Sequence, residues 1–307
     1  MLSIIIPVYN EEENLPLLFD RLYTSLEALK YPYEILFIND GSKDSSIALL
    51  TMQYKKFPDV TRVIDFEGNF GQHMAIIAGF DAMRGDYAVT LDADLQNPPE
   101  EIHKLLEALK SGHDVVGTHR ANRQDTFFRK YASRCINFMR KIITNIDMKD
   151  QGCMLRGYNK SIVKRILASN EVHTFIPATA QSYAQNSIEI EVSHEERAYG
   201  ESKYSLYSLI RLNFDLMTGY SLVPLQIFTL IGLLVSLGSF SIVGVLMYRR
   251  LFLGAEAEGL FTLFAIAFFL MGVMITGLGI VGEYIGRIYQ QVRGRPKYSI
   301  REILEKK

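Results

Sequence analysis

Two carboxylates and a side-chain amide lie close together in the segment Asp92–Gln96. Residues 87–91 before it are apolar and β-branched, which predicts a buried parallel strand, and Asn97-Pro98-Pro99 ends that strand. The polar group is therefore expected at the carboxyl end of a strand, where open α/β sheets bind their ligands. Neighbouring carboxylates repel each other unless a cation lies between them, and hard oxygen ligands favour Mg²⁺ or Mn²⁺ holding a substrate's phosphates. The competing interpretation is a solvated acidic turn that only caps the next helix.

Alternating strands and helices must position this segment. Strands are predicted at residues 2–8, 34–38, 61–66, 87–91 and 114–118. Helices are predicted from residue 13 or 14 to about 30, from 44 to 56, from about 72 to 83, and from 99 to 110. Gly85 is expected to end the third helix as a C-cap glycine. This alternation is typical of an α/β fold with a mainly parallel, doubly wound sheet that is covered on both faces.

The pattern changes after Thr118. Seven basic residues, interspersed with apolar and aromatic ones, occupy residues 120–141. Helices are predicted at 127–144 and 160–168, an edge strand at 188–192 and a polar loop at 194–204. Residues 204–218 are amphipathic and precede a long apolar run, so they predict a helix in the plane of a membrane interface.

Two apolar runs predict a membrane hairpin. No residue with a formal charge occurs from Leu216 to Tyr248 or from Gly259 to Gly282, and each run reaches the roughly 20 residues that span a bilayer. Helices in soluble cores are rarely apolar on every face for this length. The expected organisation is a domain at 1–203, an interfacial helix at 204–219, two spans within 220–290 (about 220–248 and 259–284) and a tail at 291–307.

Charges flanking the hairpin predict its orientation. Basic residues before the first span and after the second outnumber Arg249 and Arg250 at the intervening turn, so both chain ends are expected in the cytoplasm. Glu283 and Arg287, four residues apart, are expected to pair. No export signal is predicted at the N-terminus. These features predict a multi-pass membrane protein with its larger domain on the cytoplasmic side.

Composition excludes several classes of function. The net charge of −1 implies no bulk attraction to nucleic acid, and the common Gly-rich and Walker nucleotide loops are absent from the sequence. Cys135 and Cys153 lack metal-ligand spacing and are interpreted as buried thiols. His73 and His194 are interpreted as structural or hydrogen-bonding residues. An Asp-x-Asp at a strand end with a metal indicates a nucleotide diphosphate donor, and a membrane anchor indicates a lipid acceptor whose phosphate the basic stretch could bind.

Several motifs together resemble the inverting family 2 glycosyltransferases with a GT-A fold. They are Ile5–Glu11, Asn39–Ser42, Asn69–Gly71 and Asp92–Gln96. Residues 200–204 and the end of the second span, Gly282–Arg287, are similar to polyprenyl-phosphate glycosyltransferases related to dolichol-phosphate mannose synthase. Residues 71–73, 122–125, 150–156 and 175–177 most resemble the group that transfers 4-deoxy-4-formamido-L-arabinose to undecaprenyl phosphate for lipid A modification, which confers antibiotic resistance. Gln151 stands where that group more often has an aromatic residue.

The resemblance implies a role for each matching residue. The uridine pocket would be lined by Pro7, Tyr9, Glu11 and Asp40. The diphosphate and its Mg²⁺ or Mn²⁺ would be held by Asp92, Asp94 and Gln96, with Asp94 the most direct ligand. Asp150 would lie near the reacting centre as a base or a sugar-positioning group. The acceptor phosphate would be held by Arg120, Arg134, Arg197 and Lys203. The resemblance also implies a UDP-sugar donor, undecaprenyl phosphate as acceptor and a homo-oligomer, specifically a tetramer.

Purely structural roles compete with these assignments. Pro7 and Gly41 could only punctuate turns, Arg134 could face solvent, and Asp150 could cap a helix or turn. The sugar could instead be glucose or an N-acetylhexosamine. A processive polysaccharide synthase is disfavoured because such enzymes have a Gln-x-x-Arg-Trp motif and this chain has no Trp. A membrane-anchored nucleotide-sugar-binding scaffold without turnover is an alternative of another class, which the intact set of Asp92, Asp94 and Gln96 disfavours. A small transporter is disfavoured because only two spans are predicted.

Overall fold

The computed structural model describes residues 1–120, 153–169, 175–193, 195, 218, 222–252, 260–294 and 296–306. These residues belong to two compact units. One contains the sheet, its covering helices and residues 296–306, and the other contains the two long C-terminal helices. Four predicted site residues, Arg134, Asp150, Arg197 and Lys203, lie outside the described residues. So do the helix predicted at 127–144 and all of the helix predicted at 204–218 except Thr218.

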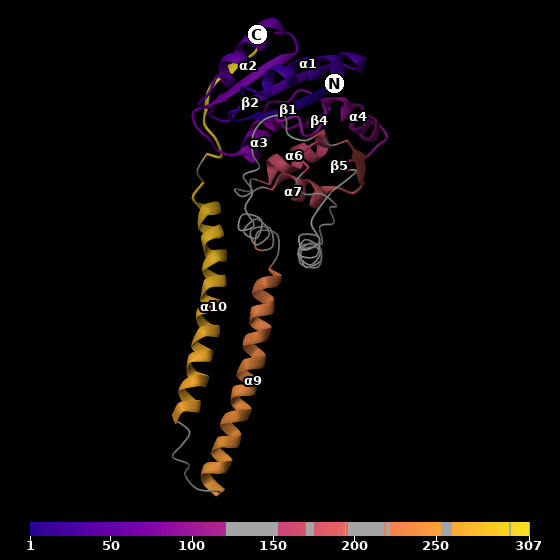
Figure 1. Ribbon diagram of the computed structural model, residues 1–307. Helices are drawn as coiled ribbons and strands as arrows, with labels where there is room; N and C mark the ends of the chain where they lie inside the picture. Colours follow the sequence, from indigo (N-terminus) through magenta and orange to yellow (C-terminus); the bar gives the residue numbers. More distant parts are fainter. Residues whose placement is uncertain are drawn as a thin grey trace. The chain divides into compact units, whose positions relative to one another are not determined.

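An eight-stranded mixed sheet forms the first unit (Figure 1). Its strands are β1 (Leu2–Val8), β2 (Tyr33–Asn39), β3 (Thr61–Phe66), β4 (Tyr87–Thr90), β5 (Val115–Arg120), β6 (Arg156–Asn159), β7 (Ser187–Val192) and β8 (Ile300–Leu304). The spatial order is β7-β5-β6-β4-β1-β2-β3-β8. β4, β1, β2 and β3 are mutually parallel, and β5 is parallel to β7. β6 and β8 run antiparallel to their neighbours.

Helices cover both faces of this sheet. One face packs against α1 (Leu15–Ala28), α2 (Ser46–Lys56) and α4 (Ile102–Lys110), the last preceded by the 3₁₀ turn η1 (Pro99–Glu101). The other packs against α3 (Gln72–Ala82), α6 (Lys160–Ala168) and α7 (Ile176–Tyr183). Alternate residues of a strand point to opposite faces, so Ile4 and Ile6 join the first core and Ile5 joins the second. The doubly wound, mainly parallel architecture is confirmed.

Several predicted elements are confirmed closely, and others require correction. The strands at 2–8 and 61–66 and the helix at 160–168 have the predicted bounds, and β7 is an edge strand as expected. β6 and α7 were not predicted. Gly85 is not a C-cap glycine, because α3 ends earlier, at Ala82. A Cβ at Gly85 would lie 2.6 Å from Ser3 Oγ, so Gly85 instead allows close approach to the start of β1.

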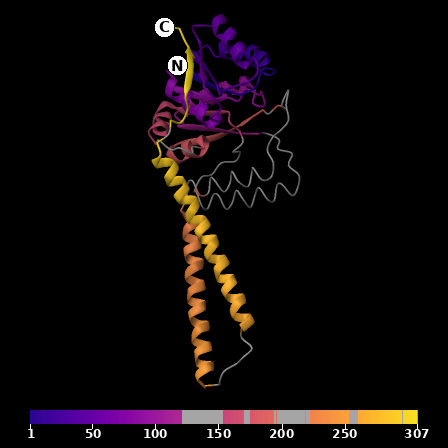
Figure 2. The ribbon, with the colours of Figure 1, turned by 90° about the vertical axis from the view of Figure 1, so that its left-hand side faces the viewer.

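The tail predicted at 291–307 is not separate from the domain predicted at 1–203. Within it, β8 pairs antiparallel with β3, and Ile64 lies opposite Ile303. The yellow C-terminal strand lies beside the indigo strands in Figure 2. An unpaired strand edge is a template for aggregation, and β8 covers the edge that β3 would otherwise expose.

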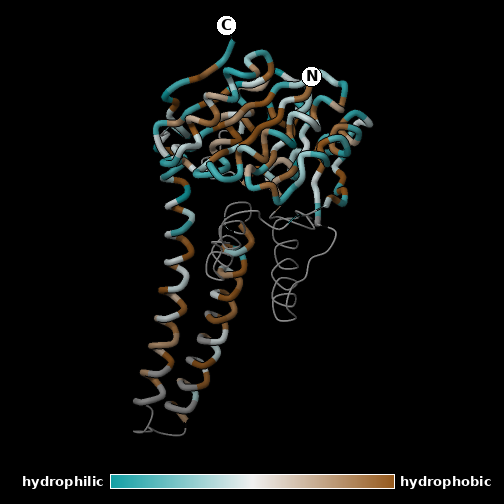
Figure 3. Tube along the Cα trace, turned by 45° about the horizontal axis from the view of Figure 1, so that its top comes forward, coloured by the Kyte–Doolittle hydropathy of each residue, from teal (hydrophilic) through white to brown (hydrophobic). Residues whose placement is uncertain are grey.

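The second unit contains α9 (Val223–Phe252) and α10 (Leu260–Val292). Two stretches, Val223–Ile242 and Ile266–Val292, are long and apolar enough to span a membrane, each with a mean hydropathy of 1.9. The share of buried residues in them is 0% and 6%, which distinguishes them from core helices of a soluble protein. Figure 3 shows hydrophobic residues, in brown, along both helices. Phe228 packs against Gly277 between the two helices. Arg287 donates to Glu283 at 2.8 Å, which confirms the predicted pair.

Candidate active site at the carboxyl edge of the sheet

The carboxyl ends of β1, β2, β3 and β4 lie along one edge of the sheet because these strands are parallel and adjacent. The segments that follow them are residues 9–12, 40–44, 67–71 and 91–97. Three of these segments carry residues predicted for the donor site: Tyr9 and Glu11, Asp40, and the Asp92–Gln96 group. Pro7 lies within β1 just before them. The topology therefore brings these predicted donor residues to the same edge.

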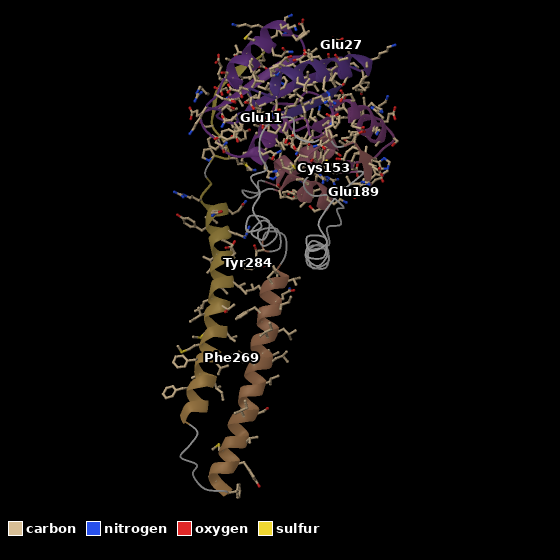
Figure 4. All side chains as sticks on the ribbon, in the orientation of Figure 1. Glu11, Glu27, Cys153, Glu189, Phe269 and Tyr284 are labelled. Carbon is tan, nitrogen blue, oxygen red and sulfur yellow. The ribbon has the colours of Figure 1, made fainter. Side chains whose placement is uncertain are left out.

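Hydrogen bonds join the loop after β1 to the loop after β2. The backbone N–H of Asn10 donates to Ser42 Oγ at 3.0 Å, and Asn10 Oδ1 accepts from the N–H of Lys43 at 2.8 Å. Asn10 has a φ of +54°, a conformation that Asn tolerates better than most residues. The N–H of Glu11, labelled in Figure 4, donates to Ser46 Oγ at 3.0 Å. These bonds fix the backbone that directly follows Tyr9, whose side chain is exposed.

Asp40 attaches the loop after β3 to the loop after β2. Its two carboxylate oxygens accept from the N–H groups of Phe70 and Gly71 at 2.7 and 2.9 Å. Burial raises the pKa of Asp40 above its ordinary value, and the two N–H donors oppose that shift. Gly41, with a φ of +66°, is required here because a Cβ would lie 2.5 Å from the carbonyl carbon of Gly68. Gly41 therefore does more than punctuate a turn.

The central Asp92–Gln96 segment forms the turn after β4. Asp92 Oδ1 accepts from Gln72 Nε2 at 2.6 Å, and Asp94 Oδ1 accepts from the N–H of Gln96 at 3.1 Å. Leu95 has a φ of +61° and a buried side chain, so the turn is anchored by an apolar residue between polar ones. Asp92, Asp94 and Gln96 themselves are partly exposed and can reach a ligand.

This donor set fits a divalent cation. Within the described ranges, no cluster of three or more His, Cys, Asp or Glu side chains could hold a metal by itself. Two carboxylates on one turn are nevertheless the set expected for Mg²⁺ or Mn²⁺, which keeps waters and takes further oxygens from a substrate's phosphates. The partly exposed Asp92 and Asp94 suit a metal that binds together with a diphosphate.

Of the four residues predicted to hold the acceptor phosphate, only Arg120 lies in the part of the chain that the structure describes. Arg120 is the last residue of β5 and lies opposite Val192 of β7, so its backbone is placed on the sheet. Asp150, Arg134, Arg197 and Lys203 fall outside the described residues, and their roles stay predictions.

Arg21 is a residue that sequence reasoning missed. From α1, its guanidinium donates to Glu100 at 2.9 Å and to Glu195 at 2.8 and 2.9 Å. The hydrogen bond from Arg21 lowers the pKa of Glu195. The N–H of Glu195 in turn donates to the carbonyl of Gln96 at 3.0 Å. Residue 195 is thereby attached to the turn that carries Asp92 and Asp94.

Cys153 makes a second contact that sequence spacing could not reveal, with Asn97. It is fully buried, as predicted for a structural thiol, and is labelled in Figure 4. Its Sγ donates to Asn97 Oδ1 at 3.2 Å and lies 2.8 Å from Thr118 Oγ1. Asn97 directly follows the Asp92–Gln96 turn, so Cys153 links that turn to the end of β5. The pairing spans 56 positions, and no local motif signals it.

His73 occupies the first turn of α3, next to Gln72. Burial lowers the pKa of its imidazole to about 4, and its ring meets Phe175 edge to face at 5.2 Å between centroids. His73 is therefore neutral near pH 7. This agrees with the interpretation of His73 as a structural residue rather than a proton donor.

Comparisons with known proteins identify the family to which the chain belongs. Residues 3–167 match the model of Glycosyl transferase family 2. Two similar relatives are the undecaprenyl-phosphate 4-deoxy-4-formamido-L-arabinose transferases of Pectobacterium carotovorum and Serratia proteamaculans. They are 49% and 46% identical to the chain over 98% of its length, and the aligned regions cover 92% and 93% of their own lengths.

One solved structure shares the fold of the sheet-containing unit. It is the crystal structure of glucosyl-3-phosphoglycerate synthase from Mycobacterium tuberculosis in complex with phosphoglyceric acid, with a TM-score of 0.50 at 14% identity. The match covers 71% of this chain and 78% of that one. At this identity the likeness concerns the fold alone.

Proposed function

Because the chain belongs to glycosyltransferase family 2, we propose that it transfers a sugar from a UDP-sugar to undecaprenyl phosphate at the cytoplasmic face of a bacterial inner membrane. The observation that carries the proposal is the 46–49% identity, over almost the whole chain, with relatives named for transfer to undecaprenyl phosphate. The GT-A fold and the polar residues after the adjacent strands β4, β1 and β2 support it. The two apolar helices support an acceptor that resides in the membrane.

The sugar proposed is 4-deoxy-4-formamido-L-arabinose, for lipid A modification. Its support is the names of the relatives. The uridine pocket is proposed to be lined by Pro7, Tyr9, Glu11 and Asp40. Support comes from the hydrogen bonds that fix the loops around Tyr9 and from the Asp40 carboxylate, which holds two backbone N–H groups.

Asp92, Asp94 and Gln96 are proposed to hold Mg²⁺ or Mn²⁺ together with the diphosphate. The bound ion would neutralise charge that develops on the departing UDP. Gln72 orients the Asp92 carboxylate through its 2.6 Å hydrogen bond. The backbone N–H of Gln96 similarly fixes one oxygen of Asp94.

The proposed reaction is one displacement with inversion. An oxygen of the acceptor phosphate attacks the anomeric carbon and forms the new C–O bond, while the bond to UDP breaks and leaves its electron pair on the diphosphate. A phosphate monoester has a second pKa of about 6, so the attacking oxygen is largely anionic at neutral pH. Asp150 is therefore proposed to position the sugar rather than to remove a proton, and catalysis rests on alignment and charge stabilisation.

The acceptor phosphate is proposed to be held by Arg120, Arg134, Arg197 and Lys203. The protein is proposed to work as a homo-oligomer, a tetramer by family resemblance. An anchored lipid keeps its phosphate near the membrane surface. Arg197 and Lys203 precede the segment 204–219, which is proposed to lie in the interface, so chain connectivity keeps them near that surface.

Radiolabelled UDP-sugars test the donor and the acceptor class together. Membranes containing the protein are incubated with each sugar, and the lipid fraction is extracted and counted. Label from UDP-4-deoxy-4-formamido-L-arabinose is expected in undecaprenyl phosphate sugar, in excess of label from UDP-glucose or a UDP-N-acetylhexosamine. Equal or better transfer of either competitor would replace the proposed sugar, and absence of lipid-linked label from every donor would refute the transferase proposal.

Replacement of Arg197 tests the acceptor site. Arg197→Ala is expected to cut transfer well over tenfold while UDP binding stays within twofold, and Arg197→Lys restores only part of the activity because Lys lacks the planar fork. Arg165→Ala is the matched control, since Arg165 is an exposed arginine on α6. Assays in neutral detergent remove anionic headgroups, whose contact with one basic residue is worth about 1 kcal/mol. Full activity of Arg197→Ala there would refute the assignment.

A further inference from the structure

The C-terminal strand β8 contacts the β3 end of the candidate donor site. Arg301 donates to Asp65 Oδ2 at 3.1 Å and to the carbonyl of Glu67 at 3.3 Å. Ser299 Oγ donates to Glu67 Oε2 at 2.6 Å, and the N–H of Glu67 donates to the carbonyl of Ser299 at 3.0 Å. These bonds lie where β3 ends and its loop begins, which is the carboxyl edge of the sheet.

Aromatic rings extend the contact into the loop after β3. Tyr298 stacks on Phe66 with centroids 5.1 Å apart and rings 8° from parallel. Phe66 in turn meets Phe70 edge to face at 5.7 Å. Phe70 is one of the two residues whose backbone N–H groups donate hydrogen bonds to Asp40. The tail thus reaches Asp40 through two ring contacts and one hydrogen bond.

A polar route reaches the loop after β2. Asp65, which binds Arg301, also accepts from Asn39 Nδ2 at 2.7 Å. Asn39 Oδ1 accepts from the N–H of Ser42 at 3.4 Å. Asn39 and Asp65 are 1% and 6% exposed, so little water competes for these bonds. Two independent sets of contacts therefore connect residues 298–301 to the two loops that Asp40 joins.

We propose that Tyr298, Ser299 and Arg301 are positioning residues for the nucleotide, so that docking of the C-terminal strand and binding of UDP favour each other. The proposal rests on the proposed function, because it takes the loops around Asp40 as the nucleotide site. Only five residues separate the end of α10 at Val292 from Tyr298. The loops that receive the donor are therefore held by the segment that emerges directly from the second membrane helix.

The opposite end of β8 supplies a matched control. Lys306 pairs with Asp59, which precedes β3. The two ion pairs belong to the same tail, Arg301 at the carboxyl end of β3 and Lys306 at its amino end, away from the donor loops. Loss of either weakens docking of the tail in general, but only loss of Arg301 disturbs the donor loops.

The test measures UDP binding with Mg²⁺ by calorimetry in the full-length protein. Arg301→Ala and Tyr298→Leu are expected to raise the UDP Kd at least fivefold, which is about 1 kcal/mol. Lys306→Ala is expected to change it less than twofold. Arg301→Lys keeps the positive charge and serves as a second variant in case Arg301→Ala fails to fold. At saturating UDP-sugar, the transfer rate of Arg301→Ala is expected within twofold of the wild type, with the loss confined to the donor KM.

Coupling must be reciprocal, which gives a second readout. Saturating UDP is expected to slow hydrogen exchange at residues 300–304 of the wild-type protein. Arg301→Ala with a Kd like that of Lys306→Ala, or exchange at 300–304 that UDP leaves unchanged, would overturn the inference. Failure of the wild-type protein to bind UDP would instead refute the proposed function, so the two failures are distinguishable.

Discussion

At the scale of single residues, Asp94 is the carboxylate expected to matter most for transfer. Asp94→Asn keeps the shape of the side chain and removes the charge proposed to face the metal and diphosphate. We expect transfer to fall at least about 10²-fold, as for loss of a principal electrostatic group. The rate is measured with saturating donor over a titration of Mg²⁺ and Mn²⁺.

Asp86→Asn is the control for that variant. Asp86 immediately precedes β4, at the opposite end from Asp94, and its exposed carboxylate pairs with the N-terminal ammonium at 3.0 Å. Its replacement is expected to leave transfer within twofold. Full activity of Asp94→Asn, or of the wild type in EDTA, would refute the metal assignment.

His73 predicts a specific pH dependence of stability. Its folded pKa of about 4 lies below the roughly 6.5 of an unfolded histidine, so the unfolded chain binds more protons between these values. Stability from the neutral ring is complete above pH ~6.5 and is lost as pH falls toward ~4, by up to about 1.4 kcal/mol per pH unit. Denaturant unfolding in detergent at pH 7 and pH 5 should therefore show a larger loss for the wild type than for His73→Gln. Equal losses would contradict the lowered pKa of His73.

Residue types and local spacing were enough to predict that Asp92–Gln96 follows a strand of a mainly parallel sheet. The structure confirms this placement at the carboxyl end of β4, while the role of the segment in binding the donor stays a proposal. Partners from distant segments could not be predicted in this way. Gln72 reaches Asp92 across 20 positions and Arg21 reaches Glu195 across 174, and such contacts depend on packing that no short pattern encodes.

At the scale of elements, Arg21 attaches the segment after β7 to helix α1 and to the turn η1. Arg21→Ala is expected to increase hydrogen exchange in peptides that contain residues 193–195, because Glu195 loses two of its hydrogen bonds. Exposed ion pairs contribute little to stability, so unfolding should change by less than about 1 kcal/mol. The KM for undecaprenyl phosphate should rise several-fold, since Arg197 lies two residues beyond Glu195.

Arg165→Ala serves again as the exposed-arginine comparison for this variant. UDP affinity should stay within twofold in both. A change in UDP affinity with an unchanged acceptor KM would assign Arg21 to the donor side instead.

Long periodic or uniformly apolar elements were predicted well, whereas three short elements were missed. β6 consists of Arg-Gly-Tyr-Asn and is a strand because β4 and β5 flank it, not because of intrinsic preference. β8 contains Arg301 and Glu302 between apolar residues and follows a membrane helix, so its composition favoured a solvated tail. Pairing with β3, which is decided by tertiary structure, makes it a strand.

At the scale of the whole molecule, the proposed orientation can be tested by labelling. A cysteine at Glu256, between α9 and α10, is expected to react with an impermeant maleimide added to intact spheroplasts. A cysteine at Met52, which is 67% exposed on α2, should react only after the membrane is opened. The wild-type chain provides the background from Cys135 and Cys153. The reverse pattern would place the sheet-containing unit on the side where UDP-sugars are absent.

The pairing of β3 with β8 also sets an order of events during synthesis. Arg301 and Glu67 are 234 positions apart, so at roughly 5–20 residues per second the ribosome needs roughly 10–50 s between them. Throughout that time β3 has an unpaired edge, and both membrane helices emerge before its partner does. A nascent chain therefore acquires its complete sheet only after its hairpin has been translated. The last strand of the enzyme's sheet is thus added only when both apolar helices are already available to enter a membrane.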